Sequence, residues 1–211
     1  MAKTAVTTDD VNAFINSCIL LRRAYIYYHD FFEPSNPHGD VFCKIAPLFF
    51  GDFNRILVMY IILEACKLAD PARDVRNNVN LSVEFFVNHT DFSNDPGEFD
   101  KLNNRAAKIR EFGQKLKPAR DKIISHLDRP TASSSIKEGA ADTYEWNEFW
   151  LDLELFVQIL CHHYFSTIRH NLILGANSDA GSIVKTLRRA DRQSSPAEYM
   201  DEDWGSLGCG T

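Results

Sequence analysis

The chain has 211 residues, of which 45% are hydrophobic and 25% are charged, and its formal net charge is −6. This composition is ordinary for a globular domain, and the length is sufficient to bury a substantial core. An aromatic content of 12% argues against wholesale disorder, because aromatic side chains contribute large burial energies. The five cysteines show no CxxC spacing, which argues against a disulfide framework or a four-cysteine zinc site and favours a reducing compartment.

The sequence shows no pattern typical of a signal peptide or of a transmembrane helix. Residues 1–12 have no apolar core and therefore do not resemble a signal peptide. The longest apolar run, residues 56–63, is shorter than the ~20 residues that span a membrane. We therefore expect a cytoplasmic protein without a membrane partner.

Apolar residues recur at steps of three and four along most of the chain. This spacing predicts helices over residues 9–32, 41–70, 81–89, 98–127, 142–175 and 178–190. Asn80 is expected to cap the short third segment, and Asp142 with Glu145 marks the start of the fifth, which Gly175 ends. Pro118 removes a backbone donor, so we expect it to kink the fourth segment or to restart a helix there.

These segments predict an all-α fold, because no strand pattern of any length is visible. We expect a bundle of four principal helices with short extra helices. The predicted parts are a helical domain over residues 1–175, a short basic helix over 176–190 and a disordered acidic tail over 191–211. An aromatic run in the first helix could stack bases, but its helical spacing favours a core role. The run comprises Tyr25, Tyr27, Tyr28, Phe31 and Phe32.

A cluster of potential metal ligands lies near the end of the fifth segment, at Cys161, His162, His163 and His170. A helical metal site favours ligands at i and i+4, or further ligands from another helix. The residues four positions after His162 and His163 are Ser166 and Thr167, which are not usual ligands. We therefore expect surface or interface histidines, no metal and no cofactor.

Residues 118–129, PARDKIISHLDR, place Arg120, Asp121 and His126 within seven positions. They lie in the region 101–130, which carries nine Lys or Arg against three acids and so sums to +6. A positive field around a titratable histidine is what binding to a phosphate backbone requires. The alternative interpretation is a solvated, lysine-rich helix face whose histidine has no role.

These residue types fit the cleavage of RNA. Histidine takes or gives a proton near neutral pH, and arginine presents a fixed fork to phosphate oxygens. On an ideal helix Arg120 and His126 are ~120° and ~9 Å apart, which suits a groove between helices or, better, a dimer interface. Asp121 either positions one of these two side chains or is an acid favoured by the dipole of a helix that starts at Pro118.

The motif and its surroundings resemble the HEPN superfamily, whose α-helical bundles carry an arginine, then a polar residue, then a histidine. Within that superfamily the chain is similar to the U-type abortive-infection branch. The similar runs are RDKIISHLD at residues 120–128, YIILEACKLAD at 60–70 and NLSVEFF at 80–86, in the expected order. The similarity covers roughly residues 10–175.

The resemblance implies a metal-independent endoribonuclease that is usually a homodimer with both motifs at the interface. It also implies a toxin-like or antiviral-defence role, restrained by an antitoxin protein or triggered by infection. Arg120 and His126 are the residues carried over, with Asp121 as the polar second position. Some members of the superfamily lack activity and act as binding or scaffold modules.

Two hypotheses follow for this chain. In the first it is an endoribonuclease in which His126 transfers protons, Arg120 stabilises the phosphate and Asp121 organises both. Lys117, Lys122 and Arg129 would then steer the RNA substrate. In the second it is a catalytically inactive helical module that binds nucleic acid or a partner protein through the same basic surface.

Overall fold

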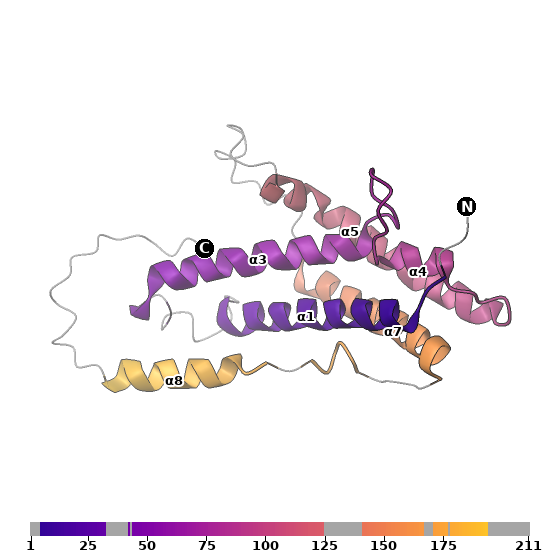
Figure 1. The fold of residues 1–211 in the computed structure, drawn as a ribbon. Helices are drawn as coiled ribbons and strands as arrows, with labels where there is room; N and C mark the ends of the chain where they lie inside the picture. The colour runs from indigo at the N-terminus through magenta and orange to yellow at the C-terminus, as the bar shows by residue number, and fades with distance from the viewer. Residues whose placement is uncertain are drawn as a thin grey trace. The chain divides into compact units, whose positions relative to one another are not determined.

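The computed structural model describes residues 5–32, 42, 44–124, 141–166, 171–176 and 178–193. These residues form α1 (Thr8–Phe32), α3 (Pro47–Ala69), α4 (Val83–His89), α5 (Pro96–Ile124), α7 (Thr143–Phe165) and α8 (Ala180–Gln193) (Figure 1). Within these ranges there is no strand, only an isolated bridge between Arg73 and Val79. The prediction of an all-α, HEPN-like bundle is confirmed. None of the described helices is both long enough and apolar enough to cross a membrane.

The helices group into two compact units. The first contains the described parts of Met1–Arg22 and Met59–Ala176, and the second contains those of Arg23–Val58 and Asn177–Thr211. Both α1 and α3 therefore contribute one end to each unit. The predicted division into residues 1–175, 176–190 and 191–211 stays a prediction.

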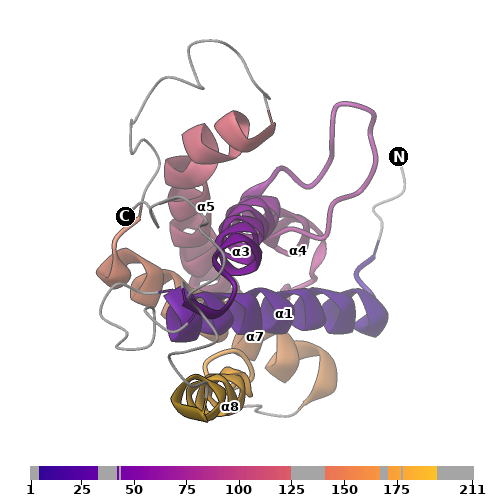
Figure 2. The ribbon, with the colours of Figure 1, turned by 90° about the vertical axis from the view of Figure 1, so that its left-hand side faces the viewer.

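The core of the first unit is aromatic and joins α1, α4 and α7. The ring of Phe14 lies 4.9 Å from that of Phe86 and 5.8 Å from that of Phe156, and all three side chains are buried. Helix α5 packs against α4 and α7 (Figure 2), and Phe112 of α5 stacks on Phe149 of α7 with ring centroids 4.6 Å apart. Rings of this size dominate the energetics of a core, so these contacts hold α5 in place.

Helix α5 approaches α3 closely at Gly113. A Cβ atom added to Gly113 would lie 2.2 Å from the Cβ atom of Ala69, so only glycine allows the two helices to come this near. Leu116 and Arg120 follow three and seven residues later, which places them on the same face of α5 as Gly113. Gly113, a residue type with low helix propensity, is therefore the residue that lets this face, with Arg120, lie against α3.

Replacing Gly113 by alanine is expected to destabilise the protein by about 1–3 kcal/mol, because the added methyl group overlaps Ala69. Gly51 provides a matched control in α3, because an added Cβ meets no atom within 4 Å there. Gly51→Ala should stabilise the helix by roughly 0.5–1 kcal/mol. Urea denaturation of both variants checks the prediction, and equal effects of the two substitutions would contradict it.

The second unit has a separate core, in which the buried face of α8 takes part. Its buried members are Phe31, Phe42, Ala180 and Val184, and Tyr27, Phe32, Phe50, Phe53 and Leu187 pack against them. The core role predicted for the aromatic run of α1 is confirmed for Phe31. The apolar residues of α8 recur at i, i+4 and i+7, while Lys185 and Arg189 are exposed, so the predicted basic amphipathic helix is present.

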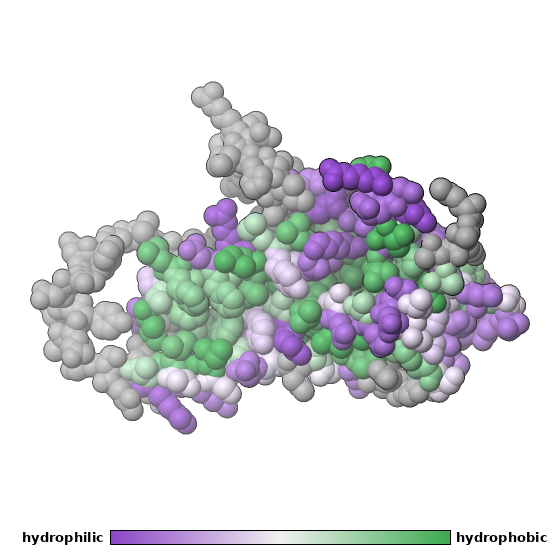
Figure 3. Space-filling view, in the orientation of Figure 1, coloured by the Kyte–Doolittle hydropathy of each residue, from purple (hydrophilic) through white to green (hydrophobic). Residues whose placement is uncertain are grey.

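Apolar side chains also gather on the surface of the second unit. They lie over the first half of α3 (Figure 3), where Leu48, Phe49 and Ile56 are each at least 60% exposed. Exposed apolar residues that gather in one place mark contact surfaces in many proteins.

Two predicted helix ends are wrong, and each has a local cause. Ser82, not Asn80, is the N-cap of α4, because the Asn80 side chain donates instead to the carbonyl oxygen of Pro71 at 2.9 Å. Helix α7 ends at Phe165, where Ser166 adopts a left-handed conformation with φ 50°. Gly175 closes a separate turn, in which its N–H donates to the carbonyl oxygen of Asn171.

Two other helices have shifted limits. The predicted segment 41–70 is interrupted at Ala46, and α3 begins at Pro47, a position where proline lacks only a donor that a helix leaves unused. Helix α8 continues to Gln193, so residues 191–193, placed in the predicted tail, are helical. The rest of the predicted tail lies outside the described residues.

Candidate functional site

Arg120 is held by two carboxylates at the C-terminal end of α5. Its Nη1 atom donates to Oδ1 of Asp70 at 2.9 Å, and its Nε and Nη2 atoms both donate to Oδ1 of Asp121 at 3.2 Å. The side chain is 20% exposed. Burial lowers the pKa of Arg120, but the hydrogen bond with Asp121 and the charge of Asp70 outweigh this effect and raise it. The guanidinium group is therefore oriented, partly exposed and permanently charged.

The position of Asp121 in α5 bears on its two interpretations. We expected Pro118 either to kink the helix or to restart it, and the restart is wrong, because Pro118 lies inside a single helix that runs to Ile124. Pro118 and Gln114 are exposed, which leaves water to satisfy the carbonyl oxygen that loses its donor. Asp121 consequently stands in the last turn of α5, where the helix dipole disfavours an acid. Its contact with Arg120 offsets that cost, which fits a positioning role.

The other candidate residues divide into two groups. Lys117 is exposed and Lys122 is half-buried, and both lie on the last two turns of α5 with Arg120. His126 and Arg129 lie outside the described residues. The structure therefore places Arg120 in contact with Asp121 and puts the two lysines on the same end of α5, and the placement of His126 relative to them stays a prediction.

Cys66 is a neighbour of Arg120 that no pattern in the sequence singles out. Its thiol lies 3.8 Å from the carbonyl oxygen of Gly113, at the close approach of α3 and α5. Burial raises the pKa of Cys66 to about 11, although the charge of Arg120 opposes the increase. The thiol is therefore protonated at neutral pH, which argues against a nucleophilic role.

Ion pairs reduce the positive field that the sequence predicts along α5. Residues 101–124 alone sum to +6. Four acids from outside this range form ion pairs with it, which lowers the sum to +2. The pairs are Lys101–Glu98 at 2.6 Å, Arg105–Asp152 at 2.6 Å, Lys108–Asp152 at 3.6 Å, Arg120–Asp70 at 2.9 Å and Lys115–Glu145. Helix α5 therefore does not present a wholly basic face.

Three members of the cysteine and histidine cluster lie at the end of α7 within the described residues, and the two histidines are on the surface. Cys161 is buried, whereas His162 and His163 are exposed in the last turn of α7. The ring of His163 packs 4.4 Å from that of Phe92. No group of three potential metal ligands occurs among the described residues, and His170 lies outside them.

A cavity of about 330 Å³ lies between α5 and α7. Its lining includes Lys108, Glu111, Lys115, Tyr144 and Glu148 around the stacked rings of Phe112 and Phe149. Both lysines already form ion pairs with acids of α7. None of the described candidate residues lines this cavity, so it is separate from the Arg120 site.

The HEPN_AbiU2 family model, described as AbiU2, matches residues 9–182 of the chain. The chain belongs to this family. AbiU2 is a HEPN family associated with abortive infection, so the resemblance inferred from the sequence is confirmed. The match extends past the predicted limit of 175 to the first residues of α8. Comparisons with curated proteins and with solved structures each gave no match.

Asp70 is the part of the site that sequence reasoning missed. It ends the run YIILEACKLAD, one of the runs on which the resemblance to the AbiU2 branch depends. In the sequence, Asp70 is only the last residue of the predicted helix 41–70, and Pro71 follows it. Its pairing with Arg120, fifty residues away, requires the approach of α3 and α5 at Gly113, which no local pattern reveals.

Proposed function

We propose that this AbiU2-family chain is a metal-independent endoribonuclease with a toxin-like or antiviral-defence role in the cytoplasm. The observation that supports this most directly is the fixed guanidinium group of Arg120 at the end of α5. Three of its five N–H groups are used by Asp70 and Asp121. The remaining two N–H groups lie in the same guanidinium plane, so their direction is also fixed, and they can donate to phosphate oxygens.

The proposed reaction is an internal transesterification of RNA. The 2′-oxygen forms a bond to the adjacent phosphorus atom, and the bond from phosphorus to the 5′-oxygen breaks. His126 takes the proton of the 2′-hydroxyl or gives a proton to the departing 5′-oxygen, which is the role of a group that titrates near neutral pH. Arg120 stabilises the negative charge that grows on the phosphate oxygens.

A homodimer would complete this reaction, because one histidine cannot be base and acid at the same moment. Two copies of His126 facing each other across a dimer axis would supply one group for each proton transfer. Exposed Leu48, Phe49 and Ile56 are consistent with an association surface on this chain. Restraint of such a nuclease would fall to an antitoxin protein or to an infection trigger.

The remaining charges at the site favour a short contact with RNA. Asp70 and Asp121 leave the surroundings of Arg120 negative by one charge, and Lys117 and Lys122 bring the sum to +1. Together with Arg129, these lysines would attract the strand. A site with this small an excess contacts few phosphates, which suits an enzyme better than a protein that coats RNA.

A catalytically inactive HEPN-like module is the second candidate, and one observation favours it. The ion pair of Arg120 with Asp70 joins α5 to the end of α3, so Arg120 also has a structural role. Under this alternative the protein binds nucleic acid or a partner protein, and no cleavage occurs.

The decisive experiment is the incubation of a mixed RNA pool with purified protein in EDTA, for the wild type and for His126→Ala. We expect cleavage by the wild type and a rate about 10²–10⁴-fold lower for the variant, because a positioned proton-transfer group contributes that much. Fold and RNA affinity should be retained. Equal cleavage by both proteins would rule out this site, and folded, RNA-binding wild type without cleavage would favour the inactive module.

A further inference from the structure

The loop between α3 and α4, residues 71–80, stands out from the helices around it (Figures 1 and 2). Residues 73–79 are all exposed, and Val75 at the tip is fully so. A connection with no other role needs no fixed conformation at such a position. This loop nevertheless has one, and we refer to it as the 71–80 hairpin.

Asp74 fastens the 71–80 hairpin from within. Its Oδ1 atom accepts from the backbone N–H groups of Arg76 and Asn78 at 2.8 Å each, and its Oδ2 atom accepts from the side-chain amide of Asn78 at 2.8 Å. These bonds, first those with Asn78, lower the pKa of Asp74, so its carboxylate stays ionised and the hairpin stays braced at neutral pH. Asn77 adopts the left-handed conformation, with φ 66°, that the tight turn needs.

The base of the hairpin is fixed beside the Arg120 site. Asn80 donates from its side chain to the carbonyl oxygen of Pro71 and from its backbone to that of Ala72, both at 2.9 Å. Pro71 directly follows Asp70, whose carboxylate accepts from Arg120. Five residues of extended chain measure about 17 Å, so the tip lies within that distance of Asp70.

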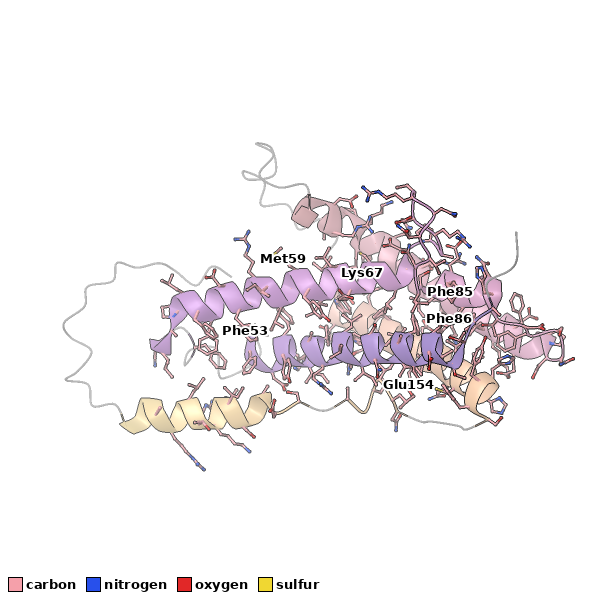
Figure 4. The ribbon with its side chains drawn as sticks, in the orientation of Figure 1. Phe53, Met59, Lys67, Phe85, Phe86 and Glu154 are labelled. Carbon is pink, nitrogen blue, oxygen red and sulfur yellow. The ribbon has the colours of Figure 1, made fainter. Side chains whose placement is uncertain are left out.

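The hairpin carries two guanidinium groups, those of Arg73 and Arg76. Arg73 uses one nitrogen, Nη1, to donate to the carbonyl and side-chain oxygens of Asn77 at 3.2 Å, which orients the group and leaves its other N–H groups to bind elsewhere. Arg76 is exposed at the tip (Figure 4 shows the nitrogen-bearing side chains along this loop). The carboxylate of Asp74 accepts three internal hydrogen bonds and stays charged. With Arg73 and Arg76 the hairpin therefore carries a net charge of +1.

We propose that the 71–80 hairpin is an RNA-positioning element, in which Arg76 and Arg73 bind backbone phosphates next to the phosphate that faces Arg120. This inference rests on the proposed function and identifies a further part of the same site. Internal hydrogen bonds fix the backbone of the hairpin, and those with Asn77 orient Arg73, before RNA arrives, so binding does not have to order a flexible loop. The hairpin also adds cations to the few that residues 101–124 retain after their ion pairs are formed.

The first test measures the binding of a short, fluorescein-labelled single-stranded RNA of mixed sequence over a series of salt concentrations. All proteins carry His126→Ala, so that the RNA is not cleaved. Arg76→Ala should weaken binding about 3–10-fold and reduce the slope of log K against log salt by about 0.7, the value for one phosphate contact with a single strand. Arg55→Ala removes an arginine of α3 that is also exposed, and it should change neither quantity. An unchanged slope for Arg76→Ala would overturn the proposal.

The second test separates preorganisation from simple charge. Asp74→Ala removes a negative charge but also releases the hairpin, so we expect it to weaken RNA binding. Asp74→Asn removes the same charge and retains an oxygen for the N–H groups of Arg76 and Asn78, so its binding should be unchanged or tighter. Tighter binding by Asp74→Ala would mean that charge alone acts, and it would overturn the positioning role.

The outcomes distinguish this inference from the nuclease proposal. If RNA binding depends on salt and requires Arg76, but the protein does not cleave RNA, the role of the hairpin would be supported and the nuclease proposal would be contradicted. If Arg76→Ala leaves the rate of cleavage unchanged, the nuclease proposal would stand and the RNA-positioning role of the hairpin would be contradicted. Unchanged RNA binding with altered self-association in sedimentation would identify the hairpin as a protein contact, and absence of RNA binding by the starting protein would also overturn the proposal.

Discussion

Replacing Arg120 by alanine is expected to lower the rate constant of RNA cleavage by about 10³-fold, the size of effect found for donors that stabilise charge in a transition state. RNA affinity should change much less. The negative charge on the phosphate oxygens grows as the bond to the 2′-oxygen forms, so the N–H groups of Arg120 interact more strongly then than in the bound ground state. Single-turnover cleavage in EDTA, at saturating protein, measures this rate constant directly.

Two variants make the Arg120 experiment interpretable. Arg120→Lys retains the charge but not the planar fork that Asp70 and Asp121 orient, so it should also cleave slowly. Arg110→Ala removes a half-buried arginine from the same helix, outside the candidate site, and should cleave at the wild-type rate. Circular dichroism and thermal unfolding show whether each variant is folded. Wild-type cleavage by folded Arg120→Ala would contradict the proposed mechanism.

The two carboxylates that hold Arg120 have opposite consequences for function. They fix the plane of the guanidinium group before substrate binds, which reduces the cost of ordering it. They also offset its charge, so a phosphate that approaches is attracted by fewer positive charges than the motif alone would provide. Under the proposed function, Lys117 and Lys122 on the same end of α5, together with the arginines of the 71–80 hairpin, would compensate for this loss.

The motif could be found in the sequence because it is local, and its surroundings could not because they are assembled from distant segments. Residue type and spacing pointed to Arg120, Asp121 and His126, and the resemblance to the HEPN superfamily made them candidates for a site. Asp70 was invisible as a partner, since its contact depends on Gly113 allowing α3 and α5 to approach. The count of lysines and arginines in 101–130 overstated the field for the same reason, because the acids that pair with them come from other parts of the chain.

Helix boundaries show a similar division between local and distant causes. The start of α7 follows from Asp142 and Glu145, whose reciprocal capping box is present in the structure. The restart that we allowed for at Pro118 did not occur: α5 continues through the proline, and beyond it Arg120 is paired with Asp70 at the end of α3. Local propensity is a weak preference that such tertiary contacts routinely exceed.

Replacing Glu154 by alanine is expected to destabilise the first unit by about 3–5 kcal/mol, the range for leaving buried polar groups without their charged partner. Glu154 lies on α7 with its side chain buried (Figure 4). Its Oε1 atom accepts from the backbone N–H of Leu172 at 3.1 Å, and its Oε2 atom accepts from those of Ile173 at 2.7 Å and Leu174 at 3.1 Å. One carboxylate thus satisfies three backbone donors in the segment that follows α7.

A graded series separates this role of Glu154 from a general effect of mutating α7. Glu154→Gln retains the volume but turns an NH₂ group toward backbone donors, so it should cost about 1–3 kcal/mol. Glu148→Gln changes an exposed glutamate of the same helix and should stay within about 0.5 kcal/mol of the wild type. Because the chain has two compact units, hydrogen exchange at the amides of Leu172, Ile173 and Leu174 is the appropriate measurement. Protection of these amides that survives Glu154→Ala would show that the turn is held by packing rather than by the carboxylate.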